Sequence, residues 1–219
     1  MTDPIEEWSA AQQRVIALVG GLSADEAEVR VPACPDWTVR DLFSHMVGLG
    51  SDVVAGDEPD DHNEAWTANQ VDTRRDHDIA ALVTEWEKAA APLREWMAAH
   101  GPRPLGDVII HEQDLRGALG VPGGQDSAGV ALIRDRFAGR WAAALPEGAS
   151  IALRGQSFSH GDVEGAAVLV AASDFDLARA LVTRRSAAQL RSWTVRGDVE
   201  PYLGSFALLG ELPARDLTE

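Results

Sequence analysis

The segment Asp107–Gly120, DVIIHEQDLRGALG, places a carboxylate and an imidazole four positions apart in a largely apolar run. In an α-helix, residues i and i+4 share a face, so Asp107 and His111 can reach one point above that face. Carboxylate oxygens and neutral imidazole nitrogens are both ligands of divalent metals. The spacing permits chelation. It also fits a solvated or capping pair, because amphipathic helices carry many acid–histidine pairs by chance.

A metal centre needs a further ligand from a second helix, and the histidines differ in how well they qualify. His45 lies within the apolar run LFSHMVG. His62 and His77 lie in polar sequence, His100 at a helix end and His160 in a turn-rich link, where solvation explains them. A histidine in an apolar stripe is also typical of a core residue that is bonded to a carbonyl group. The residues alone therefore leave both roles of His45 open.

Four segments have the apolar spacing of a helix. They are residues 3–20, 38–49, 79–97 and 105–119, with a more polar helical segment at 63–75. The first begins with Asp3 as N-cap and Pro4 at the first helical position, and the second with Thr38 and Asp41 as a capping pair. The third, long and amphipathic, contains Pro92, which predicts a kink. A loop is expected over residues 31–37, between the first two helices. Modest connections between the helices predict an antiparallel four-helix bundle.

The composition changes near residue 145, at Leu145–Gly148. Beyond it, residues 150–154 and 166–171 are short runs compatible with β-strands, and residues 174–184 and 186–193 are helical. The sequence predicts an α+β protein with a helical bundle over residues 1–145 and a small α+β domain over residues 146–219.

Charge and composition restrict the function classes. The formal net charge of -16 repels phosphate backbones and anionic membrane surfaces, so neither nucleic acid nor a membrane is an expected partner. No stretch reaches the roughly twenty apolar residues of a membrane-spanning helix. The one cysteine, Cys34, excludes an intramolecular disulfide, and we interpret it as a structural residue rather than a redox nucleophile. We expect a cytoplasmic protein.

Three segments together resemble one protein family. VPACPDWTVRDLFSHMVG, DVIIHEQDLRGALG and ARALVTRRSAAQLRSW, in that order, are similar to motifs of the mycothiol-dependent maleylpyruvate isomerase family, a branch of the DinB-like metal-binding four-helix bundles. The resemblance implies a divalent ion bound by His45, Asp107 and His111, with zinc preferred and nickel, manganese or iron as alternatives. It also implies that the C-terminal domain is sterol-carrier-like. In the family the carboxylate ligand is expected to be Glu, so Asp107 is one methylene shorter.

The chemistry that the resemblance implies uses mycothiol, a low-molecular-weight thiol, at an open position of the metal. The expected activity is that of an isomerase or S-transferase acting on a small electrophile, such as a maleylpyruvate-like compound. The resemblance further implies a catalytic arginine in the C-terminal domain, which we assign to Arg184, within the cluster Arg184, Arg185 and Arg191. Cations at a helix end are equally typical of a favourable interaction with the helix dipole. Val182 and Thr183 stand where the family is expected to have Thr-Gly.

Two other functions remain open at this point. The bundle could be a non-enzymatic metal-binding or metal-sensing protein, or it could be a metal-dependent hydrolase in which bound water replaces the thiol. The expected partners are a small-molecule thiol and a small electrophilic substrate, and the expected state is a monomer or homodimer.

Overall fold

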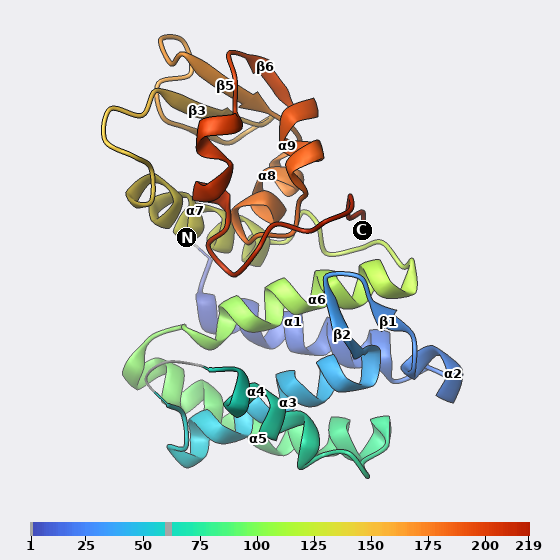
Figure 1. The fold of residues 1–219 in the computed structure, drawn as a ribbon. Helices are drawn as coiled ribbons and strands as arrows, with labels where there is room; N and C mark the ends of the chain where they lie inside the picture. The colour runs from blue at the N-terminus through green and yellow to red at the C-terminus, as the bar shows by residue number, and fades with distance from the viewer. Residues whose placement is uncertain (1, 60–62) are drawn as a thin grey trace. The chain divides into compact units, whose positions relative to one another are not determined.

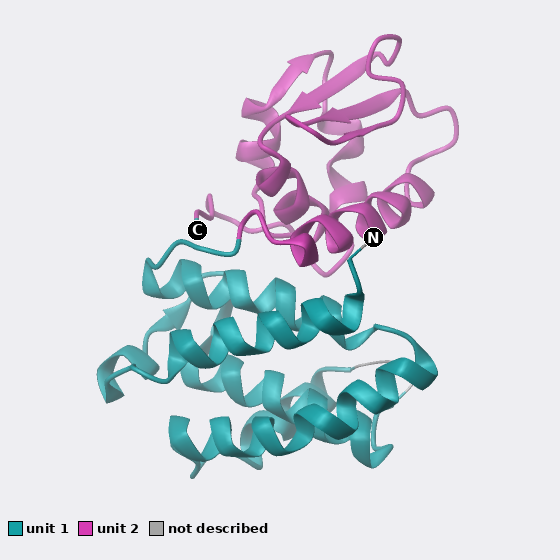
Figure 2. Cartoon of the chain, turned by 180° about the vertical axis from the view of Figure 1, so that it is seen from behind, with its two compact units in different colours: residues 1–124, 219 teal, residues 125–218 magenta. Residues whose placement is uncertain are grey.

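The structure is a computed structural model that describes residues 2–59 and 63–219. The chain divides into two compact units, residues 1–124 with residue 219, and residues 125–218 (Figure 2). Each unit is built around its own elements, helices in the first and helices with a sheet in the second (Figure 1). The α+β class predicted from the sequence is confirmed.

The first unit is a helical bundle. Its elements are α1 (Pro4–Val19), α2 (Ala24–Ala27), β1 (Arg30–Val31), β2 (Cys34–Thr38), α3 (Val39–Ala55), α4 (Glu64–Asp72), α5 (Ile79–His100) and α6 (Pro104–Leu119). The long helices α1, α3, α5 and α6 pack on one another, and α4 packs on α3. The short hairpin of β1 and β2 contacts both α3 and α6. This hairpin therefore lies beside the two helices that carry the candidate ligands.

Local sequence signals determine where these helices begin. Asp3 caps α1 by accepting from the backbone nitrogen of Ile5, with Pro4 following at the first helical position. Thr38 and Asp41 form a capping box at the start of α3. α6 ends at Gly120, whose φ of 64° is a left-handed conformation that suits glycine. Both predicted caps are confirmed, and the second fixes the start of the helix that carries His45.

The bundle core is aromatic at its centre. The ring of Trp86 on α5 makes edge-on contacts with Trp8 on α1 and Phe43 on α3, at centroid distances of 6.2 and 5.5 Å. All three side chains are buried. Edge-to-face packing adds about 0.5–1.5 kcal/mol per pair beyond the burial of apolar area. The rigid core holds α3 at a fixed rotation, which in turn fixes the direction of His45.

The second unit combines helices with a four-stranded sheet. Its elements are α7 (Ala128–Ala143), β3 (Ile151–Arg154), β4 (Ser159–His160), β5 (Val168–Ala171), α8 (Asp174–Leu181), α9 (Ala187–Ser192), β6 (Thr194–Arg196) and the 3-10 helix η1 (Glu200–Phe206). The strand order is β4-β3-β5-β6, in which β3 and β5 are parallel and the outer pairs antiparallel. The two inner strands are buried, as is typical of strands covered on both faces.

Two expectations about organisation need correction. The boundary between the units falls after residue 124, not near residue 145, because α7 packs on α8 of the second unit. Residues 31–37, which were expected to form a loop, contain a hairpin in which Val31 pairs with Cys34 across a two-residue turn. Strands this short and rich in proline give little periodic signal in the sequence.

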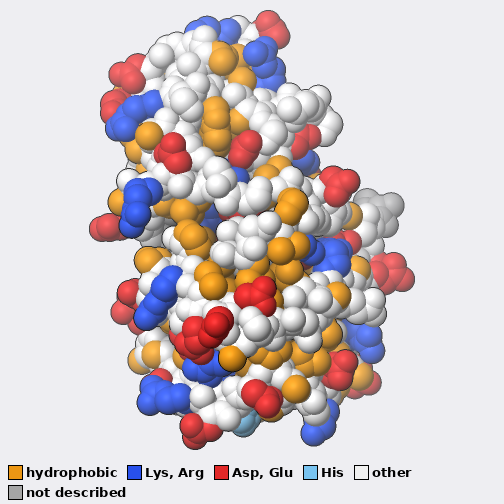
Figure 3. All heavy atoms as spheres, turned by 90° about the vertical axis from the view of Figure 1, so that its right-hand side faces the viewer, with side chains coloured by type: hydrophobic (Ala, Val, Ile, Leu, Met, Phe, Trp, Pro, Cys, Tyr) orange, Lys and Arg blue, Asp and Glu red, His pale blue; other side chains and the backbone are white. Residues whose placement is uncertain are grey.

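Charged side chains of both signs are interspersed with apolar ones on the face shown in Figure 3. Among residues 2–59 and 63–219, no helix has the length and apolar character needed to cross a membrane. Pro92 lies inside α5, which continues through it to His100.

Candidate metal centre

The structure brings the three predicted ligands together. Nε2 of His45 lies 3.2 Å from Oδ1 of Asp107, and Nε2 of His111 lies 3.4 Å from the same oxygen. The ligand atoms of the three residues all lie within 4.8 Å of one another. His45 is 5% exposed, so the cluster is largely withdrawn from solvent. Two helices distant in sequence, α3 and α6, therefore direct two nitrogens and one oxygen at one point.

These distances match the edges of a metal coordination polyhedron. Nitrogen and oxygen ligands lie about 2.0–2.2 Å from zinc, so two ligands at tetrahedral angles are about 3.3–3.5 Å apart. The two nitrogen–oxygen distances of the cluster lie within about 0.1 Å of that range. The shorter carboxylate of Asp107 thus reaches both imidazoles directly, without a bridging water.

Positions along α3 explain how His45 is held. His45, Gly48 and Asp52 follow one another at i, i+3 and i+7 and face α4. A Cβ atom on Gly48 would lie 2.6 Å from Cβ of Gln70, so only glycine lets α4 approach this closely. This approach places Gln70 beside the ring of His45.

A relay of hydrogen bonds selects the tautomer of His45. Nε2 of Gln70 donates to Oδ2 of Asp52 at 2.7 Å, and a carboxylate can only accept. The amide oxygen of Gln70 must therefore face His45, whose Nδ1 donates to it at 2.7 Å. In the neutral ring this leaves Nε2 without a proton and its lone pair directed at the cluster. Such outer partners orient ligand histidines in metal sites.

His111 is held in the same way by its own helix. Asp107, His111 and Asp114 lie at i, i+4 and i+7 on one face of α6. Nδ1 of His111 donates to Oδ2 of Asp114 at 2.9 Å, and the side chain of Asp114 is fully buried. Its burial is inconsistent with a solvent-exposed role for Asp114. In the structure it fixes the second imidazole with its Nε2 lone pair facing Asp107.

Three electron-rich atoms therefore converge, and the cluster attracts positive charge. Burial alone lowers the pKa of His45, but the charge of Asp107 and hydrogen bonds to Asp107 and Gln70 outweigh it and raise the pKa. Burial raises the pKa of Asp107, but the charges of His111 and His45 outweigh it and lower the pKa. The donor set fits a divalent ion, because one ion satisfies all three atoms at once.

Trp37 closes one side of the cluster. Its ring lies 5.0 Å from that of His45, between centroids, at an interplanar angle of 40°. The hairpin strand β2 places it there, one residue before the cap of α3. The indole packs against the ligand ring and limits its rotation.

Arg184, the predicted catalytic arginine, belongs to the second unit, whereas the three predicted ligands belong to the first. It follows α8, and its Nη1 donates to the carbonyl oxygen of Val182 at 3.3 Å. Arg185 is buried and pairs with Asp176 at 2.9 Å. Arg191 pairs with Glu200 at 2.7 Å. Internal carboxylates engage Arg185 and Arg191, and the role of Arg184 stays a prediction.

Thr183, directly before Arg184, has a backbone conformation that suits the glycine expected at this position in the family. Thr183 has a φ of 61°, a left-handed conformation that glycine adopts most easily. Its hydroxyl donates to the carbonyl of Phe206 at 2.9 Å and accepts from the backbone nitrogen of Leu209 at 2.9 Å. These two bonds hold a β-branched residue in a conformation that it otherwise rarely adopts.

Three other histidines have local partners. His77 approaches Glu85, His100 stacks on Trp96, and His160 contacts Trp141. His62 lies outside the described residues. Sequence reasoning missed Gln70 and Asp52 as partners of His45, because a glutamine in a polar helix carries no signal of its own.

Comparisons with known proteins agree with this architecture. Residues 8–116 match the family model described as the mycothiol maleylpyruvate isomerase N-terminal domain. Two uncharacterized proteins of Mycobacterium tuberculosis, from strains CDC 1551 / Oshkosh and H37Rv, are each 30% identical in an alignment of 137 positions, gaps included. The match covers 54% of this chain and 68% of each relative. The crystal structure of the mycothiol-dependent maleylpyruvate isomerase aligns with a TM-score of 0.57 at 14% identity, over 83% of this chain and 88% of that chain. This last similarity shows the shared fold.

Proposed function

The chain belongs to the mycothiol maleylpyruvate isomerase family, and from this membership and the cluster geometry we propose that it is a metal-dependent, mycothiol-dependent isomerase or S-transferase. The proposed substrate is a small electrophile, with maleylpyruvate-like compounds as the first candidates. The single observation that carries the proposal is the convergence of His45, Asp107 and His111 with both Nε2 lone pairs directed at one carboxylate oxygen.

The charge of the donor set supports a thiol as the species that binds next. Two neutral imidazoles and one carboxylate leave a divalent ion with one unit of positive charge, and three protein ligands leave coordination positions open. A bound divalent ion of this kind lowers the pKa of a coordinated thiol, so that the thiolate is available at neutral pH. An anionic thiolate also completes the neutralisation of the centre. Zinc fits this mixed nitrogen–oxygen set, and nickel, manganese and iron fit it as well.

The chain's own residues have distinct tasks in this proposal. His45, Asp107 and His111 hold the ion, while Gln70 and Asp114 keep the two imidazoles in the ligating tautomer. Trp37 shields the ring of His45 from water. In the proposed reaction the thiolate adds to a carbon–carbon double bond of the substrate, rotation follows, and elimination returns the thiol with the double bond in the other geometry.

A carboxylate substrate needs a cation besides the metal. We propose Arg184 for this task, because a guanidinium pairs with carboxylates through two parallel hydrogen bonds.

The decisive experiment separates metal binding from thiol binding. The metal-free protein is titrated by calorimetry with zinc and the zinc form then with mycothiol. We expect stoichiometric zinc binding and a second heat for mycothiol, with both lost in His45→Ala. His77→Ala is the matched control, because His77 lies in the same unit and is half exposed. Absence of thiol binding to the zinc form would overturn the proposal, and turnover without added thiol would identify a hydrolase instead.

A further inference from the structure

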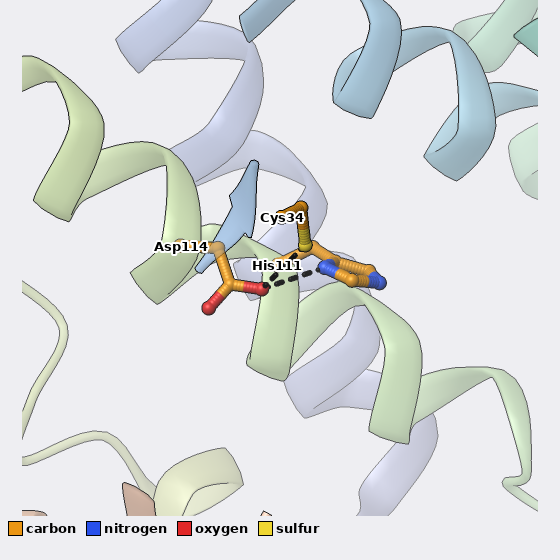
Figure 4. A group of neighbouring side chains, drawn as sticks. All are labelled: Cys34, His111 and Asp114. Atoms are coloured by element: carbon orange, nitrogen blue, oxygen red, sulfur yellow. Dashed lines mark hydrogen bonds and ion pairs between the residues drawn. The ribbon is translucent and has the colours of Figure 1, made fainter. Parts of the chain in front are cut away.

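We propose that Cys34, His111 and Asp114 form a second metal site, for a thiophilic ion, which shares His111 with the first centre. Sγ of Cys34 lies 3.8 Å from Oδ2 of Asp114, and the same oxygen lies 2.9 Å from Nδ1 of His111 (Figure 4). The ligand atoms of the three residues all lie within 4.8 Å of one another. The cluster is thus as compact as the first one, and it uses the other nitrogen of the shared ring.

The fold brings Cys34 to the shared His111 from a separate element, the β1–β2 hairpin. Cys34 is the first residue of β2, directly after the tight turn of the hairpin. Asp114 lies on α6 one turn after His111. The side chain of Asp114 is fully buried, and that of His111 is 12% exposed. The hairpin brings the sulfur to a carboxylate and an imidazole that are already fixed.

The distances suit an ion with one sulfur ligand. With a zinc–sulfur bond of about 2.3 Å and oxygen or nitrogen bonds of about 2.0–2.2 Å, tetrahedral angles place sulfur about 3.5–3.6 Å from the other ligands. The observed sulfur–oxygen distance of 3.8 Å and nitrogen–oxygen distance of 2.9 Å lie within a few tenths of an ångström of such a site. Small side-chain movements would admit an ion, and a larger ion such as Cd²⁺ needs longer ligand distances.

The charges and the ligand types give the second site a different preference from the first. A thiolate and a carboxylate together neutralise a divalent ion, whereas the first centre offers one carboxylate and two neutral rings. Thiolate sulfur selects soft and borderline ions. We therefore assign the second site to thiophilic divalent ions such as Cd²⁺ and Zn²⁺.

Sharing His111 makes the two sites competitors. When an ion binds at the second site, the thiol proton of Cys34 leaves to solvent and the ring proton of His111 moves from Nδ1 to Nε2. The ring stays neutral, but its Nε2 now carries a proton that it can donate to Asp107 and is no longer a ligand of the first centre. A thiophilic ion at Cys34 thus removes one of three ligands from the proposed catalytic ion.

The test uses the fact that the chain contains a single cysteine. Any metal–thiolate absorption on adding Cd²⁺ to the metal-free protein therefore reports Cys34. We expect one equivalent of Cd²⁺ to produce this ultraviolet band in the unmodified protein and in His45→Gln, in which the first centre lacks a ligand. In Asp114→Asn and in His111→Ala we expect the Cd²⁺ affinity to fall at least tenfold. Circular dichroism checks that each variant is folded.

The outcomes separate this proposal from the proposed function, because no mycothiol is involved. A band with unchanged affinity in both Asp114→Asn and His111→Ala would mean that the sulfur binds alone and would overturn the second site, as would the absence of a band. Competition between the two sites for His111 is tested separately, by the release of zinc. Cd²⁺ added to the zinc-loaded protein should release zinc at lower concentrations than in Cys34→Ser, and equal release in the two proteins would contradict the sharing of His111.

Discussion

Replacing Gln70 by methionine tests whether the hydrogen bonds of Gln70, and not only the three predicted ligands, contribute to metal binding at the candidate centre. Methionine has nearly the same length and shape, but it can neither accept from Nδ1 of His45 nor donate to Oδ2 of Asp52. The imidazole then loses the group that keeps its proton on Nδ1, and part of the population carries the proton on Nε2, where it blocks ligation. Loss of such an outer partner weakens metal binding by about 10- to 100-fold. This corresponds to about 1.4–2.8 kcal/mol of binding free energy.

The assay is calorimetric or dye-competition titration of the metal-free protein with zinc. Asn69→Met is the matched control, because residue 69 is the neighbouring amide on α4 and is exposed. We expect Asn69→Met to bind zinc like the unmodified protein. Thermal unfolding without metal separates loss of affinity from loss of the fold. A folded Gln70→Met protein with zinc affinity within twofold of the unmodified chain would refute the relay argument.

Three further changes test other parts of the structure. Gly48→Ala should destabilise the first unit by about 1–3 kcal/mol in urea unfolding and weaken zinc binding, because the added Cβ would lie 2.6 Å from Cβ of Gln70. Gly139→Ala is the control: its added Cβ meets nothing within 4 Å, so the change should be neutral or stabilising. Burial raises the pKa of Glu85, but hydrogen bonds to Arg74 and Ser51 and the charges of Arg74 and His77 outweigh it and lower the pKa below 4.5. Glu85→Gln should therefore reduce the free energy of unfolding by about 1 kcal/mol near neutral pH and by progressively less as the pH falls through that lowered pKa. A loss of stability independent of pH would contradict the ion pair. Thr183→Val should destabilise the second unit by about 1–3 kcal/mol in thermal unfolding, because it removes both hydrogen bonds of the hydroxyl. An unchanged unfolding temperature would show that these bonds do not stabilise residue 183.

The sequence predicted those parts of the fold that depend on local chemistry. Asp3 and Thr38 cap helices because a side-chain oxygen meets a free backbone nitrogen within three residues, which is visible in any sequence. The unit boundary was misplaced by about one helix, since nothing within α7 itself indicates that it packs on α8. Packing partners are long-range properties, and amphipathic spacing gives a buried face without identifying its neighbour.

The candidate site likewise combines features that the sequence predicts locally with features that depend on packing between distant segments. The spacing of Asp107 and His111 on α6 could be read from the sequence, and the resemblance supplied His45. Gln70, in contrast, acquires its role only when Gly48 lets α4 approach α3. Cys34 was interpreted as structural because no histidine lies near it in the sequence. In space it is next to His111, which the hairpin of β1 and β2 brings about.

The shorter carboxylate of Asp107 has a consequence for specificity. Because Oδ1 of Asp107 is already 3.2 and 3.4 Å from the two imidazole nitrogens, an ion held by these three residues would lie close to the backbone of α6. A glutamate at this position would hold the ion about one carbon–carbon bond farther from that helix, and the open coordination positions would shift with it. A thiolate and an electrophile bound to those positions would be displaced by a similar distance, and misplacement on this scale changes reaction rates strongly. We therefore predict that Asp107→Glu alters the substrate preference of this chain.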